Sequence, residues 1–425
     1  MQKLRIYILL TLFLVIGNNQ AQNTDSLAIA ITENRELPSD SLVIRFLTEA
    51  GIPITSNNSI KLLPSGREKF KDLFQFIEQA EHHIHMEYFN FRNDSIAAEL
   101  FNLLSVKAAQ GVEVRLLFDA FGNWSNNRPL KKKQLKEIRS KKIEIVKFDP
   151  ISFPYINHVF HRDHRKIVVI DGKIGYTGGM NIADYYIDGL PKIGAWRDMH
   201  LRLEGEGVRY LQEIFLDIWN KEAKQQIGGE AYFPPLNDDT ITNGKTVAIV
   251  DREPRVSPKI LRRTFVKSIN SAQNTVQIVN PYFVPTKSVK KALKKALSRG
   301  VDVEIMISSK SDISFTPDAS HYIAHQLMKK GAGIYLYNKG FHHSKIMMID
   351  HSFCTVGSAN LDSRSLRYDY ETNAFIFNKE TTKELIDMFE ADKKESTILT
   401  EEKWKERSQW RRFVGWFAHL FTPFL

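Results

Sequence analysis

The chain has 425 residues, of which 43% are hydrophobic and 25% are charged. This composition excludes a disordered protein, because such a chain can bury a large core, and the length allows two or three domains of roughly 100–200 residues each. The formal net charge of +10 favours partners that carry phosphate, either nucleic acid or an anionic membrane surface.

The N-terminus has the pattern of an export signal. Lys3 and Arg5 precede an apolar run over residues 6–16, and polar residues follow. The run is shorter than the ~20 apolar residues needed to cross a bilayer, so residues 1–21 are predicted to be a signal peptide, with a short retained membrane segment as the alternative. Residues 22–59 are predicted to be a polar lead-in with one short helix.

Helices and strands then alternate in the same order twice. The phrases AAQGVEVRLLFD and ALSRGVDVEIMIS occupy the same place in each copy. A period of about 180 residues is too long for a solenoid and indicates two homologous halves related by a pseudo-two-fold axis. The predicted elements are a helix over 70–80, a strand over 84–91, a helix over 96–110 and a strand over 112–119, and then a helix over 265–272, a strand over 276–283, a helix over 289–299 and a strand over 301–308.

This alternation predicts an α/β fold in which each half has a mixed sheet flanked by helices. The first half is assigned to residues 60–232 and the second to residues 233–400. Gly, Pro and Asn cluster over residues 228–239, where the linker between the halves is expected. Residues 401–425 are predicted to form an amphipathic C-terminal helix rich in basic and aromatic residues.

Each half contains the pattern His-x-Lys-x4-Asp, and the two copies lie 179 positions apart. An Asp-Gly pair after the β-branched residues of the first copy predicts a hairpin turn. Since residues i and i+2 of a strand share a face, the His and the Lys of each copy are expected to project together. The motif residues are His164, Lys166, Asp171, Gly178, Gly179 and Asn181 in the first half, and His343, Lys345, Asp350, Gly357, Ser358 and Asn360 in the second.

One His, one Lys and one Asn supplied twice can hold and attack a phosphodiester without a metal or another cofactor. If the axis brings both histidines to one phosphorus, one can attack it to form a phosphohistidine while the other protonates the leaving oxygen. The phosphate oxygens would then be held by Lys166, Lys345, Asn181, Asn360 and Ser358.

Each histidine also needs an acid on its other ring nitrogen, which sets the tautomer. Asp198 lies 34 residues after His164, and Glu371 lies 28 residues after His343, so these two acids are the candidates. The motif aspartates, Asp171 and Asp350, are interpreted as turn residues that brace the hairpins, with a direct catalytic role as the alternative.

With these residues in place, the chain resembles the phospholipase D superfamily and, within it, the bacterial cardiolipin synthases. The twin motif is matched in full by both halves, and the narrower likeness rests on longer phrases and covers residue 60 to the C-terminus. These phrases are HRDHRKIVVIDGKIGYTGGMNIADYY, WRDMH, NPYFVP and HHSKIMMIDHSFCTVGSANLDSRSLRYDYETN.

The resemblance implies two phospholipase D-like halves with a single active site at their interface and no metal. It implies transfer of a phosphatidyl group between two phosphatidylglycerol molecules, giving cardiolipin and glycerol, with His164 as nucleophile and His343 as general acid and base. The alternative within the superfamily is hydrolysis, by a phospholipase D or by a phosphodiesterase or nuclease, and only this alternative calls for nucleic acid as a partner. The oligomeric state is left open.

Bacterial members of this branch usually begin with two transmembrane helices, whereas here a short signal-like run precedes the polar lead-in, so membrane contact is expected elsewhere. The C-terminal residues predict either an interfacial helix or a terminal helix packed on the core. The expected location is outside the cell membrane, associated with its periplasmic face. The C-terminal pattern comprises Phe413, Val414, Phe417, Leu420, Phe421 and Phe424 at helical spacing, Arg407, Arg411 and Arg412 beside them, and Trp404, Trp410 and Trp416 between them.

The remaining features are predicted to be structural. The basic run over 128–142 is interpreted as a solvated helix face, with attraction to anionic lipid or nucleic acid as the alternative. The others are His82, His83 and His85, whose spacing resembles a metal site without acidic or Cys partners, Glu87 and Asp119, which end strands near the site, and Cys354, the single cysteine, as a buried thiol that excludes an intrachain disulfide.

Overall fold

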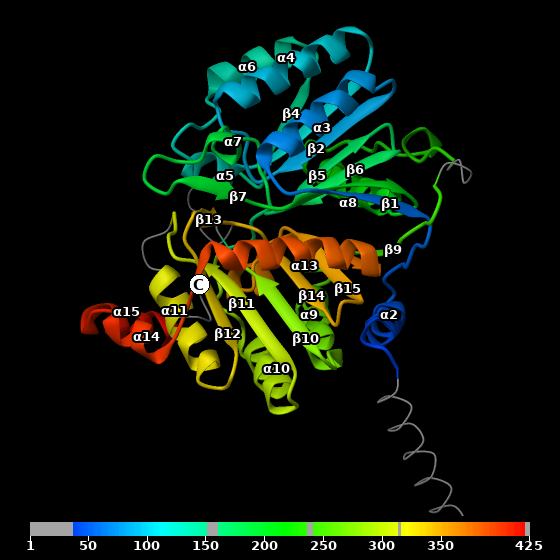
Figure 1. Ribbon diagram of the computed structural model, residues 1–425. Coiled ribbons are helices and arrows are strands. Elements are labelled where there is room, and N and C mark those ends of the chain that lie inside the picture. Colours follow the sequence, from blue (N-terminus) through cyan, green and yellow to red (C-terminus); the bar gives the residue numbers. More distant parts are fainter. Residues whose placement is uncertain (1–36, 151–159, 236–240, 313–315, 421–425) are drawn as a thin grey trace, which may run out of the picture.

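The computed structural model describes residues 37–150, 160–235, 241–312 and 316–420, so the predicted signal segment lies outside the described residues. It consists of two α/β halves, one above the other in Figure 1. The first half comprises β1 (Asn58–Leu63), α3 (Gly66–Gln79), β2 (His83–Tyr88), α4 (Ser95–Ala109), β3 (Glu113–Asp119), α5 (Ala120–Ser125), α6 (Lys132–Ser140), β4 (Glu144–Phe148), β5 (Lys166–Ile170), β6 (Ile174–Gly178), α7 (Tyr185–Asp188), β7 (Ala195–Arg197), β8 (His200–Gly205), α8 (Val208–Ala223) and the 3-10 helix η2 (Glu230–Tyr232).

The second half repeats the order of the strands in the sheet, adds β17, α14 and α15 at its end, and has no counterpart of α5 or η2. It comprises β9 (Thr246–Arg252), α9 (Ile260–Ser271), β10 (Thr275–Val279), α10 (Lys287–Ser298), β11 (Asp302–Ser308), α11 (Thr316–Met328), β12 (Gly333–Tyr337), β13 (Gly340–His342), β14 (Ile346–Ile349), β15 (Phe353–Gly357), α12 (Ser363–Arg367), β16 (Glu371–Phe377), α13 (Lys379–Lys394), β17 (Ser396–Ile398), α14 (Glu401–Glu406) and α15 (Gln409–Leu420).

The two sheets have the same strand order, which confirms the predicted duplication. The first sheet runs β1-β8-β6-β5-β2-β3-β4, and the second, read from its β9 edge, runs β9-β16-β15-β14-β10-β11-β12-β17. In each sheet two parallel pairings lie beside antiparallel ones, so both are mixed. The predicted fold class is therefore confirmed, and the strand carrying each motif is a central strand of its own sheet.

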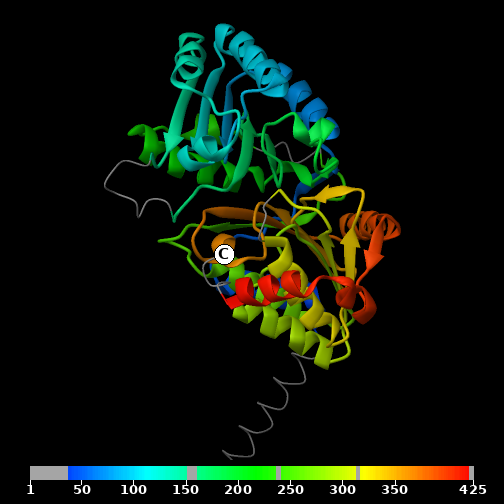
Figure 2. The ribbon, with the colours of Figure 1, turned by 90° about the vertical axis from the view of Figure 1, so that its left-hand side faces the viewer.

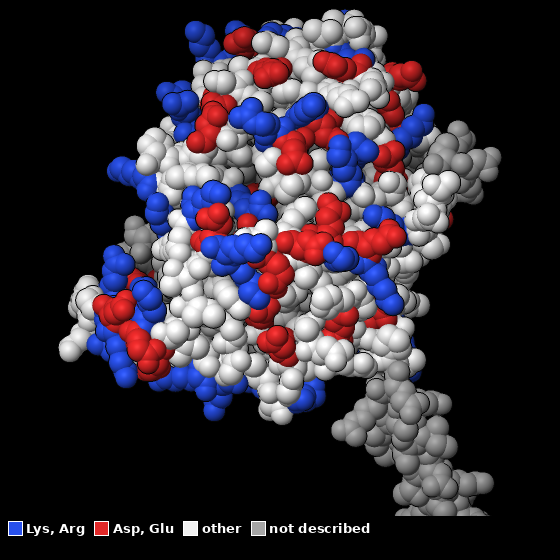
Figure 3. All heavy atoms as spheres, in the orientation of Figure 1, with Lys and Arg blue, Asp and Glu red and all other residues white. Residues whose placement is uncertain are grey.

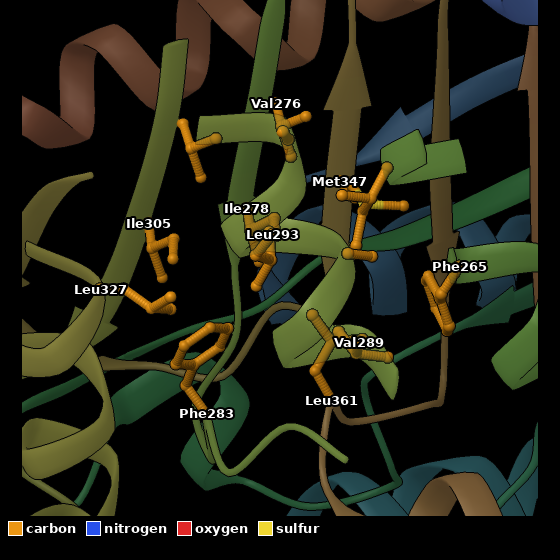
Figure 4. Close-up of a cluster of buried hydrophobic side chains, with 14 of the residues drawn as sticks. Phe265, Val276, Ile278, Phe283, Val289, Leu293, Ile305, Leu327, Met347 and Leu361 are labelled. Carbon is orange, nitrogen blue, oxygen red and sulfur yellow. The ribbon is translucent and has the colours of Figure 1, made fainter. Parts of the chain in front are cut away.

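Each half buries its own apolar core between the sheet and its outer helices. In the second half this core joins α9, α10 and α11 to the strands, and Figure 4 shows Leu293 of α10 beside Ile278 and Leu327 of α11 beside Ile305. The first half has the equivalent cluster beneath α3, α4 and α6. Burial of these side chains is the main source of stability, because the single cysteine leaves no disulfide to contribute.

A third apolar cluster is shared by both halves. It combines Ile167 and Leu201 of the first sheet with Met348 and Val356 of the second, and β6 contacts both β15 and β16 across the interface. Cys354 lies fully buried in this cluster, where burial raises the pKa of its thiol to about 12, as expected of a structural cysteine. The halves therefore form one continuous body with the motifs at their contact.

The predicted helix of the lead-in is α2 (Ser39–Glu49), and it packs on the second half. Val43 and Leu47 join the second core beside α9, although β1, the next element, belongs to the first sheet. A bridge between Thr55 and Val247 continues this crossing. The described chain thus packs first on the second half, then builds the first half and returns, which ties the halves together. The hydroxyl of Ser39 on α2 lies 3.0 Å from that of Ser352, in the hairpin turn of the second motif.

Two strands end earlier than the sequence pattern predicts. The strand predicted over 276–283 ends at Val279, because Asn280 is followed by Pro281, which has no N–H for the ladder. The strand predicted over 84–91 ends at Tyr88, after which the chain turns towards the motif. Among the described residues, no helix is both long and apolar enough to cross a bilayer.

Candidate active site

Each motif lies on a β-hairpin whose turn is held by the motif aspartate. Asp171 and Asp350 have positive φ angles of 54° and 50°, and each carboxylate accepts three backbone N–H groups at 2.7 to 2.9 Å. The donors belong to residues 81–83 in the first half and 273–275 in the second, at the start of β2 and of β10. Both aspartates therefore fasten the hairpin to the neighbouring strand and face away from the histidines.

Replacing Asp171 or Asp350 with alanine is expected to lower the free energy of unfolding by about 3 kcal/mol, since roughly 1 kcal/mol is lost for each hydrogen bond removed. Denaturant unfolding of the full chain measures this. Lys173→Ala, an exposed change in the first turn, is the matched control and should leave stability unchanged. A variant that stayed as stable as the parent but lost activity would return the aspartates to a catalytic role.

The two histidines are paired with acids across the interface, each with the acid of the other half. Nδ1 of His164 lies 3.0 Å from Oε1 of Glu371, 207 residues away, and Nδ1 of His343 lies 2.6 Å from Oδ2 of Asp198, 145 residues away. The chain order that places Asp198 with His164 and Glu371 with His343 is therefore the wrong pairing. Both acids are buried, so these hydrogen bonds are shielded from water.

Backbone contacts enforce this exchange. The N–H of His164 donates to the carbonyl of Tyr370, which precedes Glu371, and the N–H of His343 donates to the carbonyl of Arg197, which precedes Asp198. Beside the contact between His343 and Arg197, strands β7 and β13 form a parallel pair. Beside the contact between His164 and Tyr370, an isolated bridge joins Asp163 to Tyr370. The backbone of each motif histidine is thus bonded to the residue that precedes the acid of the other half.

The two lysines lie beneath the histidines and lack full counter-charge. Nζ of Lys166 donates to the carbonyl of His164, and Nζ of Lys345 donates to the carbonyl of His343 and lies 3.1 Å from its Nε2. Burial lowers the pKa of Lys166 to about 7 and that of Lys345 to about 8, although Glu371 and Asp198 act in the opposite direction. An anionic phosphate bound here would stabilise both ammonium groups.

The same surroundings favour the neutral form of both histidines. Burial first, and then the charges of Lys166 and Lys345, hold the pKa of His164 well below its usual range. The pKa of His343 is also lowered by burial and by Lys345, while Asp198 raises it. With Nδ1–H donated to a carboxylate, each ring carries its lone pair on Nε2. In His343 this atom lies 3.1 Å from Nζ of Lys345, and the side chain of His164 remains 16% exposed, so an entering substrate can reach it.

Ser358 supports one of the two acids, and its predicted contact with the substrate phosphate stays a prediction. Its hydroxyl donates to the Glu371 carboxylate and accepts the N–H of Thr372 at 3.0 Å. The equivalent residue of the first half is Gly179, where a Cβ would lie 2.2 Å from Oδ1 of Asp198. One acid is thus held by a hydroxyl and the other by close backbone contact, so the two halves differ here.

The motif asparagines are buried near the histidines with unused amide atoms. Oδ1 of Asn181 and Oδ1 of Asn360 have no hydrogen-bond partner in the part of the chain that the structure describes. The amide nitrogen of Asn181 donates weakly to the Tyr186 hydroxyl, at 3.3 Å. Since a buried amide left unpaired costs free energy, both asparagines are placed to gain a partner when a substrate binds.

Aromatic side chains surround one histidine, a feature the sequence argument missed. The ring of His343 lies 5.3 Å from Trp196, 5.5 Å from Phe341 and 6.0 Å from Tyr282, whereas His164 has only Phe89 within the same range among the described rings, at 5.2 Å. Trp196 precedes Asp198 by two residues in the WRDMH phrase, so that phrase was the available signal.

A buried lysine was also missed. Nζ of Lys69, on α3, donates to the carbonyl of Asn181 at 3.2 Å, and burial holds its pKa well below the usual range while Asp198 acts against this shift. Lys69 sits among the apolar residues of an amphipathic helix, and nothing in the helical spacing distinguishes it from a solvent-facing lysine. It anchors the backbone of a motif asparagine.

Glu87 and Asp119 serve neighbouring arginines rather than lining the site. Glu87 lies 3.4 Å from Arg165, and burial together with Asp163 raises its pKa. Asp119 lies 3.3 Å from Arg162 and accepts the N–H of Gly122, which caps α5. Both pairs are buried in the first half, beneath the residues that flank His164.

The other residues predicted to be structural also lie away from the site. Gln212 connects the histidine cluster, with 3.0 Å to Nε2 of His83 and 2.9 Å to Nδ1 of His85. The basic run over 128–142 contains α6, which buries Leu135 and Ile138 and exposes its lysines. This is the solvated helix face that the sequence favoured.

Comparison with known proteins agrees with this site. The family described as "Cardiolipin synthase, PLD-like domain" matches residues 73–189 and 265–393, one segment in each half. Cardiolipin synthase of Alkalihalophilus pseudofirmus is 34% identical over 374 residues, which is 88% of this chain and 73% of that protein. Cardiolipin synthase of Listeria monocytogenes is 36% identical over 387 residues, covering 90% of this chain and 79% of that protein.

Among solved structures, phosphatidylserine synthase of Haemophilus influenzae superposes with a TM-score of 0.67 at 14% identity, covering 90% of this chain and 97% of that one. This likeness concerns the fold. The sequence matches carry the assignment further, because they extend over most of the chain and include both motifs. The chain belongs to the family of cardiolipin synthases with phospholipase D-like domains, and it is an enzyme of the phosphatidyltransferase class.

Proposed function

We propose that the protein transfers a phosphatidyl group from one phosphatidylglycerol molecule to a glycerol hydroxyl of a second, giving cardiolipin and free glycerol. The observation that carries this proposal is the crossed pairing of His164 with Glu371 and of His343 with Asp198 at one interface, with both motif lysines beside them. Two histidines oriented in this way supply a nucleophile and a proton carrier to a single phosphorus.

In the first step Nε2 of His164 attacks the phosphorus, and the bond from phosphorus to the leaving glycerol oxygen breaks. His343 enters this step as the imidazolium, with Asp198 holding its Nδ1–H, and gives its Nε2 proton to that oxygen, so glycerol leaves neutral and a phosphohistidine remains. In the second step His343 takes the proton of the incoming hydroxyl, whose oxygen attacks the phosphorus as the N–P bond breaks. His164 regains its lone pair, and cardiolipin is released.

The electrostatics support this assignment of roles. The pKa of His164 is held furthest below its usual range, which suits a nucleophile that must stay unprotonated. Asp198 raises the pKa of His343 against burial and so favours the proton that the leaving oxygen requires. The ammonium groups of Lys166 and Lys345 and the side-chain N–H groups of the motif asparagines would stabilise the charge on the nonbridging oxygens.

The substrates are lipids, so the reaction takes place at a membrane surface. The export pattern of residues 1–21 supports a location outside the cell membrane, at its periplasmic face, with that segment either removed or retained. Phosphatidylglycerol is anionic, which suits a chain with a net charge of +10.

Product analysis tests the reaction. Full-length protein incubated with phosphatidylglycerol vesicles should form cardiolipin and glycerol in equal amounts, measured by mass spectrometry, and a parallel incubation with added phosphatidylethanolamine identifies the second lipid. His164→Asn protein is the control for contaminating activity. Phosphatidic acid as the only lipid product, or cleavage of added DNA without cardiolipin, would replace the transferase with a hydrolase.

A further inference from the structure

The terminal helix α15 is seated firmly on the second half. Gly415 faces α11 so closely that a Cβ would lie 2.5 Å from the carbonyl oxygen of Asp318. Arg407, just before α15, pairs with the carboxylate of Asp318, and the ring of His419 lies 5.3 Å from that of Tyr322. The predicted docked helix is therefore present, and Figure 2 shows it lying across the second half beside α11 and α10.

Large aromatic side chains nevertheless project from the outer face of this docked helix. Trp410 is 70% exposed, Phe413 is 50% exposed and Trp416 is 44% exposed. Phe413 lies within 5.8 Å of both tryptophan rings, so the three form one apolar patch. A cluster of exposed large aromatic side chains is typical of an interaction surface, and Trp beside Phe is typical of a helix that lies at a lipid headgroup boundary.

A basic surface adjoins this aromatic patch. Nζ of Lys290, on α10, lies 3.1 Å from Nε2 of His419, on α15. Helices α9 and α10 contain no acidic residue. In the described part of the chain, none of their lysines and arginines forms an ion pair with a carboxylate. These residues are Arg262, Arg263 and Lys267 on α9, and Lys287, Lys290, Lys291, Lys294 and Lys295 on α10.

A shallow pocket between α2, α9 and α10 concentrates this charge. It has a volume of about 500 Å³, and its charged lining residues are all basic: Arg262, Arg263, Lys267, Lys287 and Arg367. Burial and the nearby Arg367 lower the pKa of Arg262, and burial followed by Lys294 and Lys287 lowers that of Lys290. The protein itself supplies no counter-charge here, and basic side chains line the lower edge of the molecule in Figure 3, where α10 lies in Figure 1.

We propose that α15, α10 and α9 form one docking face for a bilayer that contains anionic phospholipid. The aromatic patch of α15 enters the headgroup boundary, and the basic pocket and α10 bind the phosphates of lipid headgroups. The face lies outside the active site, so docking and phosphatidyl transfer are separate properties that can be measured apart. An anionic bilayer is the occupant chosen because the face combines exposed Trp and Phe with cations that have no acid to pair with.

Quenching of tryptophan fluorescence by brominated phosphatidylglycerol in phosphatidylcholine vesicles reports which surface enters the bilayer. Trp196, Trp219 and Trp404 are buried, whereas Trp124, on α5 of the first half, is 74% exposed. The measurement is therefore made in a Trp124→Phe background, in which quenching should come mainly through the tryptophans of α15. The double variant Trp410→Phe with Trp416→Phe keeps an apolar helix and should lose most of the quenching. Quenching that persisted unchanged in this variant would overturn the proposed face.

The charge on α10 is tested with a matched basic helix. The triple variant of Lys287, Lys291 and Lys294 to Gln should weaken binding to vesicles with phosphatidylglycerol roughly a hundredfold, given the gain typical of each basic residue at an anionic surface. The control changes Lys132, Lys133 and Lys136 to Gln on α6, which lies at the far end of the molecule, and should alter binding less than twofold. Equal losses in both variants, or binding to duplex DNA in place of vesicles, would refute the proposal.

Activity in detergent micelles separates docking from catalysis. Both the α10 and the α15 variants should form product at the parental rate when phosphatidylglycerol is dispersed in neutral detergent, because neither set touches the histidines. Loss of activity in micelles would show that these residues act on the site itself. A parent protein that binds vesicles but forms no cardiolipin would instead contradict the proposed reaction and leave the docking face standing.

Discussion

Replacement of either His164 or His343 with alanine is expected to reduce cardiolipin formation by at least about 10³-fold, because nucleophile and proton carrier act as a unit. For the same reason the double variant should be no slower than the slower single variant. The measurement is the initial rate of product formation at saturating phosphatidylglycerol. The two single variants should differ in one respect: labelled phosphatidyl groups should accumulate on His343→Ala protein and not on His164→Ala protein.

The control for this pair is His351→Asn, an exposed histidine in the second hairpin turn with a φ of 56° that asparagine accepts readily. This variant should keep full activity. Circular dichroism should show all the variants folded, since the histidine rings contribute little to the shared core. Turnover retained in either alanine variant would exclude a site built from both motifs, and label trapped on His164→Ala protein would reverse the two roles.

The second prediction concerns the two acids, each of which pairs with the histidine of the other half. Glu371→Gln and Asp198→Asn keep the shape of each acid and remove its charge, and each should lower kcat by roughly 10²- to 10⁴-fold through the histidine of the opposite half. Glu371→Gln should slow formation of the phosphohistidine. Asp198→Asn should affect the proton transfers of His343.

The pH profile distinguishes this role from simple damage to the fold. Asp198 raises the pKa of His343, so its removal lowers that pKa. The proton needed by the leaving oxygen is then lost at lower pH, and the alkaline limb of kcat should move downward. Asp217→Asn, an exposed change on α8, is the matched control. An unchanged alkaline limb in Asp198→Asn, or the same shift in Glu371→Gln alone, would disprove the crossed pairing.

Much of the fold follows from local patterns in the chain. The repeat of helices and strands, the hairpin turns at Asp171 and Asp350, and the shared face of each His and Lys all depend on residues close in sequence. These features are set by periodicity and turn chemistry, which act over a few residues. The ends of the strands were predicted less accurately. A single residue such as Pro281 can end a strand although the apolar pattern of the sequence runs on beyond it.

The contents of the site were also predictable, but not its connections. The sequence identified both histidines, both lysines and both acids, since their types and spacing match the chemistry of phosphate transfer. It could not show that Ser358 supports Glu371, or that Trp196 and Phe341 enclose His343, because those contacts join segments of both halves or residues on neighbouring strands.

The sequence by itself therefore determined the two halves, the residues of the site and the family to which the chain belongs. Only the tertiary structure decided which acid serves which histidine, that α2 packs on the second half, and that α15 is both docked and aromatic on its outer face. The physical reason is the same in each case. These arrangements depend on how the halves pack against one another, and packing over 145 or 207 residues of separation leaves no periodic trace along the chain.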